Sequence, residues 1–179
     1  YYLKNRWKNP KVFLLGTPLL EEDFQSRGIR LTEDNPDAVV VGFDTTLTYE
    51  KLSKACAFIR NGVPFIATHP DNNCPTETGF IPDCGAMCAF ITQSTGILPK
   101  VLGKPYAETM DYILDDLNCT KEELVFVGDR LYTDIAIGAR NGATSVLVLT
   151  GETKLTDVDS SDVKPDIIVE RLVDLADLF

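Results

Sequence analysis

Two aspartates in the C-terminal half of the chain are placed to bind a cation. Asp129 follows the apolar run LVFV at 124–127 after one glycine, and Asp134 comes where a helix is expected to begin. Carboxylates across a strand–turn–helix junction can face one cation, and their hard oxygen atoms suit Mg²⁺. The alternative is that Thr133 or Asp134 only caps the next helix. The two residues alone leave both interpretations open.

Lys104 is a second candidate for chemistry. It stands in the segment Gly103-Lys104-Pro105, and Pro105 is expected at the first position of a helix. A lysine there faces the positive end of the helix dipole, which is unfavourable unless an anion such as phosphate binds between them. A solvated loop lysine is the alternative interpretation.

A third polar cluster, at 67–71, follows another apolar run and contains Thr68, His69 and Asp71. We expect His69, the single histidine, to shape or gate a pocket, because no serine or cysteine in a nucleophile setting accompanies it. The five cysteines show no paired spacing and are expected to be reduced thiols. Cys84 and Cys88 would share a helix face, and buried small side chains are favoured over a zinc site.

The elements that would position these residues alternate along the chain. Strands are predicted at 11–15, 38–43, 64–67, 124–127, 144–149 and 167–169. Helices are predicted at 17–27, 48–61, 84–93, 106–117, 134–141 and 171–178, with a loop at 69–82. This alternation with short connections predicts an α/β fold with a largely parallel sheet. The cluster of Gly96, Pro99 and Gly103 indicates a domain boundary near 96–100.

Composition excludes several classes of function. The 179 residues carry a formal net charge of −10, and 44% of them are hydrophobic. Nothing supplies the basic face that nucleic-acid binding needs, so no nucleic-acid partner is expected. No apolar run approaches the length of a membrane span, and no secretory signal opens the chain. A cytoplasmic protein without a membrane partner is therefore predicted.

Lys104, Asp129 and Asp134 have the order and spacing of the last two motifs of the haloacid dehalogenase (HAD) superfamily. Together with VVVGFDTTLTYEKL, IATHPDNNCP, the LGKP lysine, VGDRLYTDI and VLTGET, in this order, they closely resemble its class IIA branch of NagD-like, 4-nitrophenylphosphatase-like phosphatases. The resemblance covers residues 12–179. It implies a parallel-sheet, Rossmann-like HAD core with an α/β class II cap. The cap would be residues 1–98, and residues 99–179 would form the C-terminal half of the core.

The resemblance also implies a function. Members of this family hydrolyse small phosphate monoesters, such as sugar or aryl phosphates, with Mg²⁺ and through an aspartyl-phosphate. Asp129 would bind Mg²⁺ directly, Asp134 would assist as a metal-site and catalytic residue, and Lys104 would bridge the nucleophile and the phosphoryl group. The partner would be a small phosphorylated metabolite, and a homodimer could form through the cap. The residues that would contact substrate are Thr68, His69, Asp71, Asn72 and Lys104.

The family motif Asp-x-Asp-Gly-Thr, which supplies the nucleophile, does not stand before Lys11. We therefore expect the nucleophile upstream of this chain, and we expect these residues alone to be inactive. One alternative is a complete minimal phosphatase in which Asp44 attacks and Thr68 binds phosphate, although Thr46 stands where the family has its second aspartate. Another alternative is a non-catalytic module that binds phosphate compounds.

Overall fold

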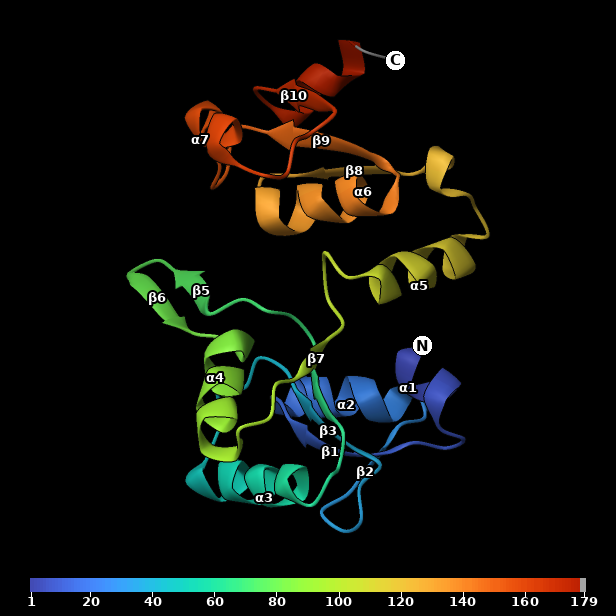
Figure 1. The fold of residues 1–179 in the computed structure, drawn as a ribbon, viewed down its shortest axis with the longest axis vertical. Coiled ribbons are helices and arrows are strands. Elements are labelled where there is room, and N and C mark those ends of the chain that lie inside the picture. Colours follow the sequence, from blue (N-terminus) through green and yellow to red (C-terminus); the bar gives the residue numbers. More distant parts are fainter. Residues whose placement is uncertain (178–179) are drawn as a thin grey trace. The chain divides into compact units, whose positions relative to one another are not determined.

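The chain folds as two units that divide after Gly103. The computed structural model describes residues 1–177, and Figure 1 traces its elements. The predicted division lay at residue 98, before strand β7 (Lys100–Val101). The structure keeps β7 in the first unit, because β7 pairs with strand β4 (Phe65–Ala67) of that unit. We call residues 1–103 unit 1 and the residues from 104 on unit 2.

Unit 1 is built on a five-stranded sheet in which every neighbouring pair is parallel. The strand order is β2-β1-β3-β4-β7, with β1 at Lys11–Leu15, β2 at Arg30–Leu31 and β3 at Ala38–Val41. All four residues of β3 are buried, as expected for a central strand covered on both faces. The predicted parallel α/β architecture is thereby confirmed for this unit.

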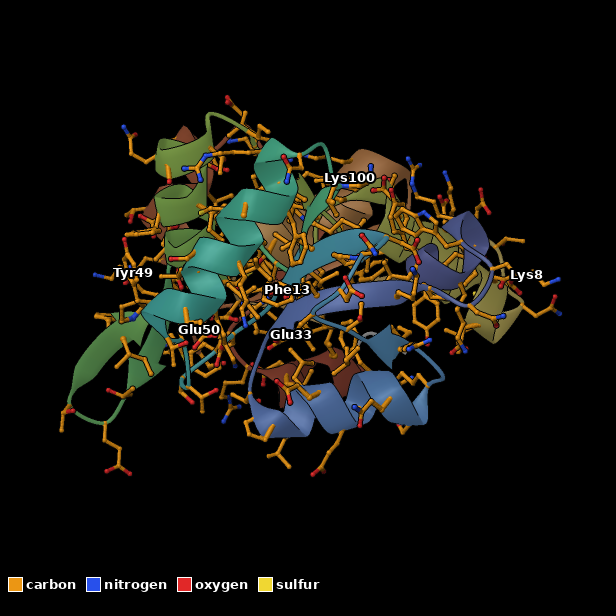
Figure 2. The ribbon with its side chains drawn as sticks, turned by 90° about the horizontal axis from the view of Figure 1, so that it is seen from below. Lys8, Phe13, Glu33, Tyr49, Glu50 and Lys100 are labelled. Carbon is orange, nitrogen blue, oxygen red and sulfur yellow. The ribbon has the colours of Figure 1, made fainter. Side chains whose placement is uncertain are left out.

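Alternate side chains of β1 build the two faces of this sheet. Phe13 and Leu15 pack toward helices α3 (Tyr49–Arg60) and α4 (Cys84–Thr95). Phe13, labelled in Figure 2, lies against Phe58 of α3 with ring centroids 5.3 Å apart. Val12 and Leu14 pack on the opposite face. That face is covered by α1 (Tyr2–Arg6) and α2 (Pro18–Ser26).

The helix ends of unit 1 follow local sequence signals. The Thr17 hydroxyl accepts a hydrogen bond from Leu20 N at the start of α2, and the Thr48 hydroxyl accepts one from Lys51 N at the start of α3. Gly62 follows α3 with φ +86°, the left-handed conformation that glycine adopts without strain. These caps explain why the predicted boundaries of both helices lie within a residue or two of the observed ones.

The predicted loop at 69–82 is wrong in part. Residues Asn73–Thr76 (β5) and Gly79–Pro82 (β6) form an antiparallel hairpin. Every residue of β6 is exposed, and Gly79 turns the chain with φ +139°. The hairpin buries no face, so its sequence carries none of the alternation by which a strand is predicted.

Unit 2 contains a three-stranded parallel sheet in the order β10-β9-β8. The strands are β8 (Val125–Gly128), β9 (Thr144–Val148) and β10 (Ile167–Val169), and the helices are α5 (Ala107–Leu117), α6 (Ala136–Asn141) and α7 (Leu155–Ser160), with short 3-10 helices at Lys121–Glu123 and Leu172–Asp177. Met110 of α5 and Ile137 of α6 pack together in its core. Helix α7 was not predicted, and Leu178, in the last predicted helix, lies outside the described residues.

None of the helices in the described part of the chain has the length and apolar character that a bilayer-spanning helix requires.

Candidate active site

Asp129 stands directly after β8, at the carboxyl end of a parallel strand. Its Oδ2 accepts a hydrogen bond of 2.7 Å from Glu152 N, and its carbonyl oxygen accepts one of 3.2 Å from Thr153 N. A Cβ atom on Gly151 would lie 2.0 Å from the same Oδ2. The turn after β9 therefore encloses the Asp129 carboxylate with backbone, and only glycine fits at position 151.

Asp134 lies in a single π-helical turn, Leu131–Ile135, that precedes α6. Such turns are rare and concentrate at functional sites. The Asp134 Oδ2 accepts a hydrogen bond of 3.3 Å from Arg130 N. The interpretation of Asp134 or Thr133 as the cap of α6 is wrong, because α6 begins at Ala136, after Ile135, and no side chain caps it.

Lys104 donates a hydrogen bond from its ammonium group to Asp134 Oδ1. The Lys104 side chain is 51% exposed and that of Asp134 is 14% exposed, so the ion pair is open to solvent on the lysine side. The expected position of Lys104 beside a helix terminus is wrong. Helix α5 begins at Ala107 with Tyr106 before it, and the bond between Lys104 and Pro105 is cis.

The two carboxylates have the donor chemistry that Mg²⁺ prefers. Both offer hard oxygen atoms beside the carboxyl end of β8. Glycines make room for them, since a Cβ on Gly128 would lie 2.3 Å from Asp134 Cβ, as one on Gly151 would meet Asp129. These residues fit the cation that the sequence predicts, with Lys104 beside it as a fixed positive charge.

The polar cluster after β4 lies in unit 1 and is held together by the histidine. His69 Nδ1 lies 2.8 Å from Thr68 Oγ1, and His69 Nε2 lies 2.9 Å from Asp83 Oδ1. Asp83 is buried, and the same Oδ1 accepts a hydrogen bond of 2.6 Å from Cys84 N at the start of α4. The imidazole therefore connects the end of β4 to the first turn of α4.

Asp71 and Asn72 follow on a loop that is docked on the same helix. The Asp71 carbonyl accepts a hydrogen bond of 2.7 Å from Gly85 N, and the Asn72 carbonyl accepts one of 2.9 Å from Asp83 N. A Cβ on Gly85 would lie 2.3 Å from the Pro70 carbonyl oxygen. The close approach of loop and helix therefore depends on a glycine at position 85.

Helix α4 carries two thiols next to this cluster, those of Cys84 and Cys88. A hydrogen bond from Cys88, assisted by His69 and Thr68, lowers the pKa of the Cys84 thiol to about 6. The same hydrogen bond and burial raise the pKa of Cys88. In its thiol form Cys84 donates to the Val41 carbonyl oxygen, 3.1 Å away. All five cysteines are free, as expected for reduced thiols.

Asp44, the alternative nucleophile, is a buried member of unit 1. Its Oδ1 accepts hydrogen bonds from the backbone N–H and the hydroxyl of Thr46, at 2.8 and 2.7 Å. Its Oδ2 pairs with Lys51 Nζ at 3.2 Å, and the Asp44 side chain is 0% exposed. Both carboxylate oxygens are thus engaged by neighbours that join the end of β3 to α3, which is the arrangement of a structural ion pair.

In unit 2 the structure pairs Lys104 with Asp134, and it places Asp129 directly after Gly128, the residue of β8 that lies against Asp134. In unit 1 it brings together Thr68, His69 and Asp71. Reasoning from the sequence missed Asp83 and Gly151. Asp83 directly precedes a predicted helix, and an aspartate at that position indicates an ordinary N-cap and not a partner for His69. The signal for Gly151 was its place two residues after a predicted strand, which identifies a turn but not the carboxylate that the turn encloses.

Comparison with known proteins supplies independent evidence. The HAD-hydrolase-like family model matches residues 101–175. The chain is 38% identical over 165 residues to the acid sugar phosphatase of Staphylococcus epidermidis, covering 92% of this chain and 64% of that protein. It is 35% identical over 170 residues to the ribonucleotide monophosphatase NagD of Escherichia coli, covering 95% of this chain and 67% of NagD.

Solved structures show the same likeness in three dimensions. The crystal structure of 4-nitrophenylphosphatase from Thermotoga maritima matches with a TM-score of 0.92 at 46% identity, covering 98% of this chain and 68% of that one. This chain thus spans about two thirds of the length of its relatives. The sequence, the parallel α/β fold and these matches agree, and the chain belongs to the class IIA, NagD-like branch of the haloacid dehalogenase superfamily.

Proposed function

We propose that this chain serves the Mg²⁺-dependent hydrolysis of small phosphate monoesters. The observation that carries the proposal is the constellation of Lys104, Asp129 and Asp134 at the carboxyl end of β8. A lysine held by one of two carboxylates, beside glycines that keep the site narrow, is suited to a dianionic phosphoryl group bound together with a cation. Relatives named as phosphatases support the same reaction class.

Each residue has a separate task in this proposal. Asp129 and Asp134 would hold Mg²⁺, which neutralises charge on the phosphoryl oxygens when it is bound. Lys104 contacts the phosphoryl oxygens from its solvent-exposed side, and Asp134 keeps the ammonium group in place. The backbone N–H of Glu152 fixes the orientation of the Asp129 carboxylate. The chain thereby provides charge stabilisation that exists before the substrate arrives.

The attacking carboxylate requires a position beside these groups. Among the described strands, β8 pairs with β9 alone and leaves its other edge open. Val125 and Val127 on β8 are 47% and 41% exposed, although valines of a parallel sheet are ordinarily covered. We propose that a further parallel strand pairs with β8 at this edge, and that the nucleophilic aspartate stands at its carboxyl end, next to Asp129.

The reaction then has two balanced displacements. An oxygen of the nucleophilic carboxylate forms a bond to phosphorus while the bond from phosphorus to the leaving-group oxygen breaks, and that oxygen takes up a proton, which the second aspartate of the family motif would donate. Water next gives a proton to the same second aspartate and attacks phosphorus, the bond to the nucleophile's carboxylate oxygen breaks, and inorganic phosphate leaves. Throughout both steps, Lys104 compensates the charge of the phosphoryl oxygens.

The loop after β4 is proposed to recognise the leaving group. Thr68, His69 and Asp71 lie together at the carboxyl edge of the unit 1 sheet, and Asn72 is exposed beside them. Their hydroxyl, imidazole, carboxylate and amide groups can hydrogen-bond a sugar or polyol phosphate. A homodimer through unit 1 and a cytoplasmic location stay predictions, as does the assignment of residues 1–98 as a cap.

The test is phosphate release by the complete protein that contains this chain, with 4-nitrophenyl phosphate and sugar phosphates as substrates. We expect Lys104→Met, Asp129→Asn and Asp134→Asn each to lower kcat/KM by at least about 100-fold, because each removes charge from the transition state. Chelation of divalent cations should abolish turnover, and added Mg²⁺ should restore it.

Asp44→Asn is the control that separates this proposal from the alternatives. The Asp44 carboxylate is occupied by Thr46 and Lys51, so its loss should reduce stability and leave kcat/KM within a few-fold. Loss of turnover in Asp44→Asn with full activity in Asp129→Asn would overturn the proposal. Binding of phosphate esters without hydrolysis by the complete protein would instead identify a non-catalytic module.

A further inference from the structure

Unit 1 carries a second group of potential metal ligands, on the loop that is proposed above to recognise the leaving group. His69, Asp71 and Asp83 each offer one ligand atom, and these atoms all lie within 4.8 Å of one another. We propose that this cluster binds a divalent transition-metal ion, such as Zn²⁺ or Co²⁺, at a site chemically distinct from the carboxylate pair of unit 2. The inference does not rest on the proposed function.

The imidazole of His69 presents Nδ1 to Thr68 and Nε2 to the cluster. The Thr68 hydroxyl can donate to Cys84 Sγ, 3.9 Å away, whether the sulfur is a thiol or a thiolate. When its proton points to the sulfur, the Thr68 oxygen can accept from His69 Nδ1, 2.8 Å away. In that tautomer Nδ1 carries the proton and Nε2 presents a lone pair to the cluster.

That lone pair meets a carboxylate oxygen. His69 Nε2 lies 2.9 Å from Asp83 Oδ1, and in that tautomer the two acceptors repel unless a cation lies between or beside them. A proton on Nε2 is one solution, and a metal ion shared by the nitrogen and the two carboxylates is the other. Metal-bound histidines ordinarily donate their second N–H to a fixed acceptor, the role that Thr68 fills here.

The backbone holds the three ligands in place before any ion binds. The bonds from Asp83 N to the Asn72 carbonyl and from Gly85 N to the Asp71 carbonyl fasten the loop to the first turn of α4. Asp83 is buried and Asp71 and His69 are half-buried, so two carboxylates share a setting of reduced dielectric constant. A bound cation offsets the repulsion between these carboxylates, which favours occupation of the site.

The donor set selects the kind of metal. One imidazole nitrogen with two carboxylate oxygens suits borderline ions such as Zn²⁺ and Co²⁺, whereas Mg²⁺ prefers oxygen ligands alone. Three protein ligands leave at least one coordination position open, as in zinc sites that bind an exchangeable ligand. His69 also lines a cavity of about 410 Å³ between the loop and α4, so a small anionic ligand can reach the metal.

The experiment is a Co²⁺ titration of the tag-free protein carrying Asp129→Asn and Asp134→Asn, which removes the carboxylates of unit 2. We expect one ion to bind with visible d–d absorption, and Zn²⁺ to displace it. His69→Ala and Asp83→Asn should weaken the affinity at least about 10-fold, as removal of a direct ligand requires. Asp83→Asn keeps a side chain that can cap α4, and Trp7 fluorescence and circular dichroism verify that each variant folds.

Histidine spectroscopy makes the assignment unambiguous, because the chain contains a single histidine. Pulsed electron paramagnetic resonance of the Cu²⁺-loaded protein should show coupling to one imidazole nitrogen, absent in His69→Ala. Thr68→Val should weaken binding about 10-fold or more, and Thr68→Ser should restore it, because the hydroxyl orients the ring. Equal Co²⁺ affinity in His69→Ala, or no imidazole coupling, would show that a proton alone joins His69 and Asp83 and would overturn the proposal.

Discussion

At the scale of single residues, the site of unit 2 depends on glycines as much as on charged groups. Gly151 lies against the Asp129 carboxylate, and Gly128 lies against Asp134. Neither glycine has a positive φ, so the requirement comes from the space that the carboxylates occupy and not from backbone conformation. The carboxylates are thus held by backbone atoms, which cannot adopt alternative rotamers.

Gly151→Ala should reduce turnover of the active protein by about 100-fold, because the new Cβ would displace the Asp129 carboxylate from its position 2.0 Å away. The measurement is kcat/KM together with the Mg²⁺ concentration required for half-maximal activity. Gly142→Ala is the matched control. Gly142 has φ +81° and nothing within 4 Å of its Cβ position, so that variant should lose stability and retain kcat/KM.

The ion pair of Asp44 and Lys51 makes a second prediction at the residue scale. Lys51→Met would leave the Asp44 carboxylate, 0% exposed, without its cation, and should lower the free energy of unfolding by about 3 kcal/mol. Urea denaturation measures this loss. Lys54→Met removes a lysine from the exposed pairs with Glu33 and Glu50 and should leave the unfolding midpoint nearly unchanged. Equal losses in both variants would contradict a structural role for Asp44.

At the scale of elements, caps and packing decide where helices begin. The open edge of β8 in turn indicates where a further strand is expected to pair. Thr17 and Thr48 begin α2 and α3 by accepting backbone hydrogen bonds. No comparable side chain begins α6, which continues directly from the π-helical turn that contains Asp134. Helix α6 is therefore started by the geometry of the site and not by a local signal.

Thr48→Ala should destabilise unit 1 by about 1 kcal/mol, because Lys51 N loses its acceptor at the start of α3. Chemical denaturation followed by Trp7 fluorescence reports the change, since Trp7 packs against the core of unit 1. Thr48→Ser retains the hydroxyl and should remain within a few tenths of a kcal/mol of the parent. A Ser variant as unstable as the Ala variant would show that the cap contributes little.

At the scale of the whole molecule, the chain has separate cores for its two units. Ile59 belongs to the core of unit 1 and Ile137 to that of unit 2, and both are almost fully buried. Separate cores mean that removal of one side chain should affect one unit more than the other. The single tryptophan, Trp7, lies in unit 1 and distinguishes the units in solution.

Ile59→Ala should lower the midpoint of unfolding seen by Trp7 fluorescence, at a cost of about 2–5 kcal/mol. Ile137→Ala should leave that midpoint nearly unchanged while shifting part of the transition seen by far-ultraviolet circular dichroism. An equal shift of the Trp7 signal in both variants would mean that the two units unfold as one cooperative body.

Prediction from sequence succeeded where one face of an element is buried. The strands Lys11–Leu15 and Ile167–Val169 have the predicted bounds, and helix α3 ends before the glycine that was expected to end it. Prediction failed for the β5–β6 hairpin, which buries no face, and for α7, whose sequence is too polar to show a periodic stripe. The start of α5 was also predicted wrongly. Pro105 was expected at the first position of the helix, whereas the helix begins two residues later, at Ala107.

By itself, the sequence determined the parallel α/β class and the family, because apolar runs and motifs in a given order are properties of the chain. It also identified Lys104, Asp129 and Asp134 as candidates. Only the tertiary structure decided that Lys104 pairs with Asp134, that Gly151 encloses Asp129, and that Asp83 joins His69. Each of these contacts joins residues 14 to 30 positions apart, and it arises only when neighbouring strands and helices pack.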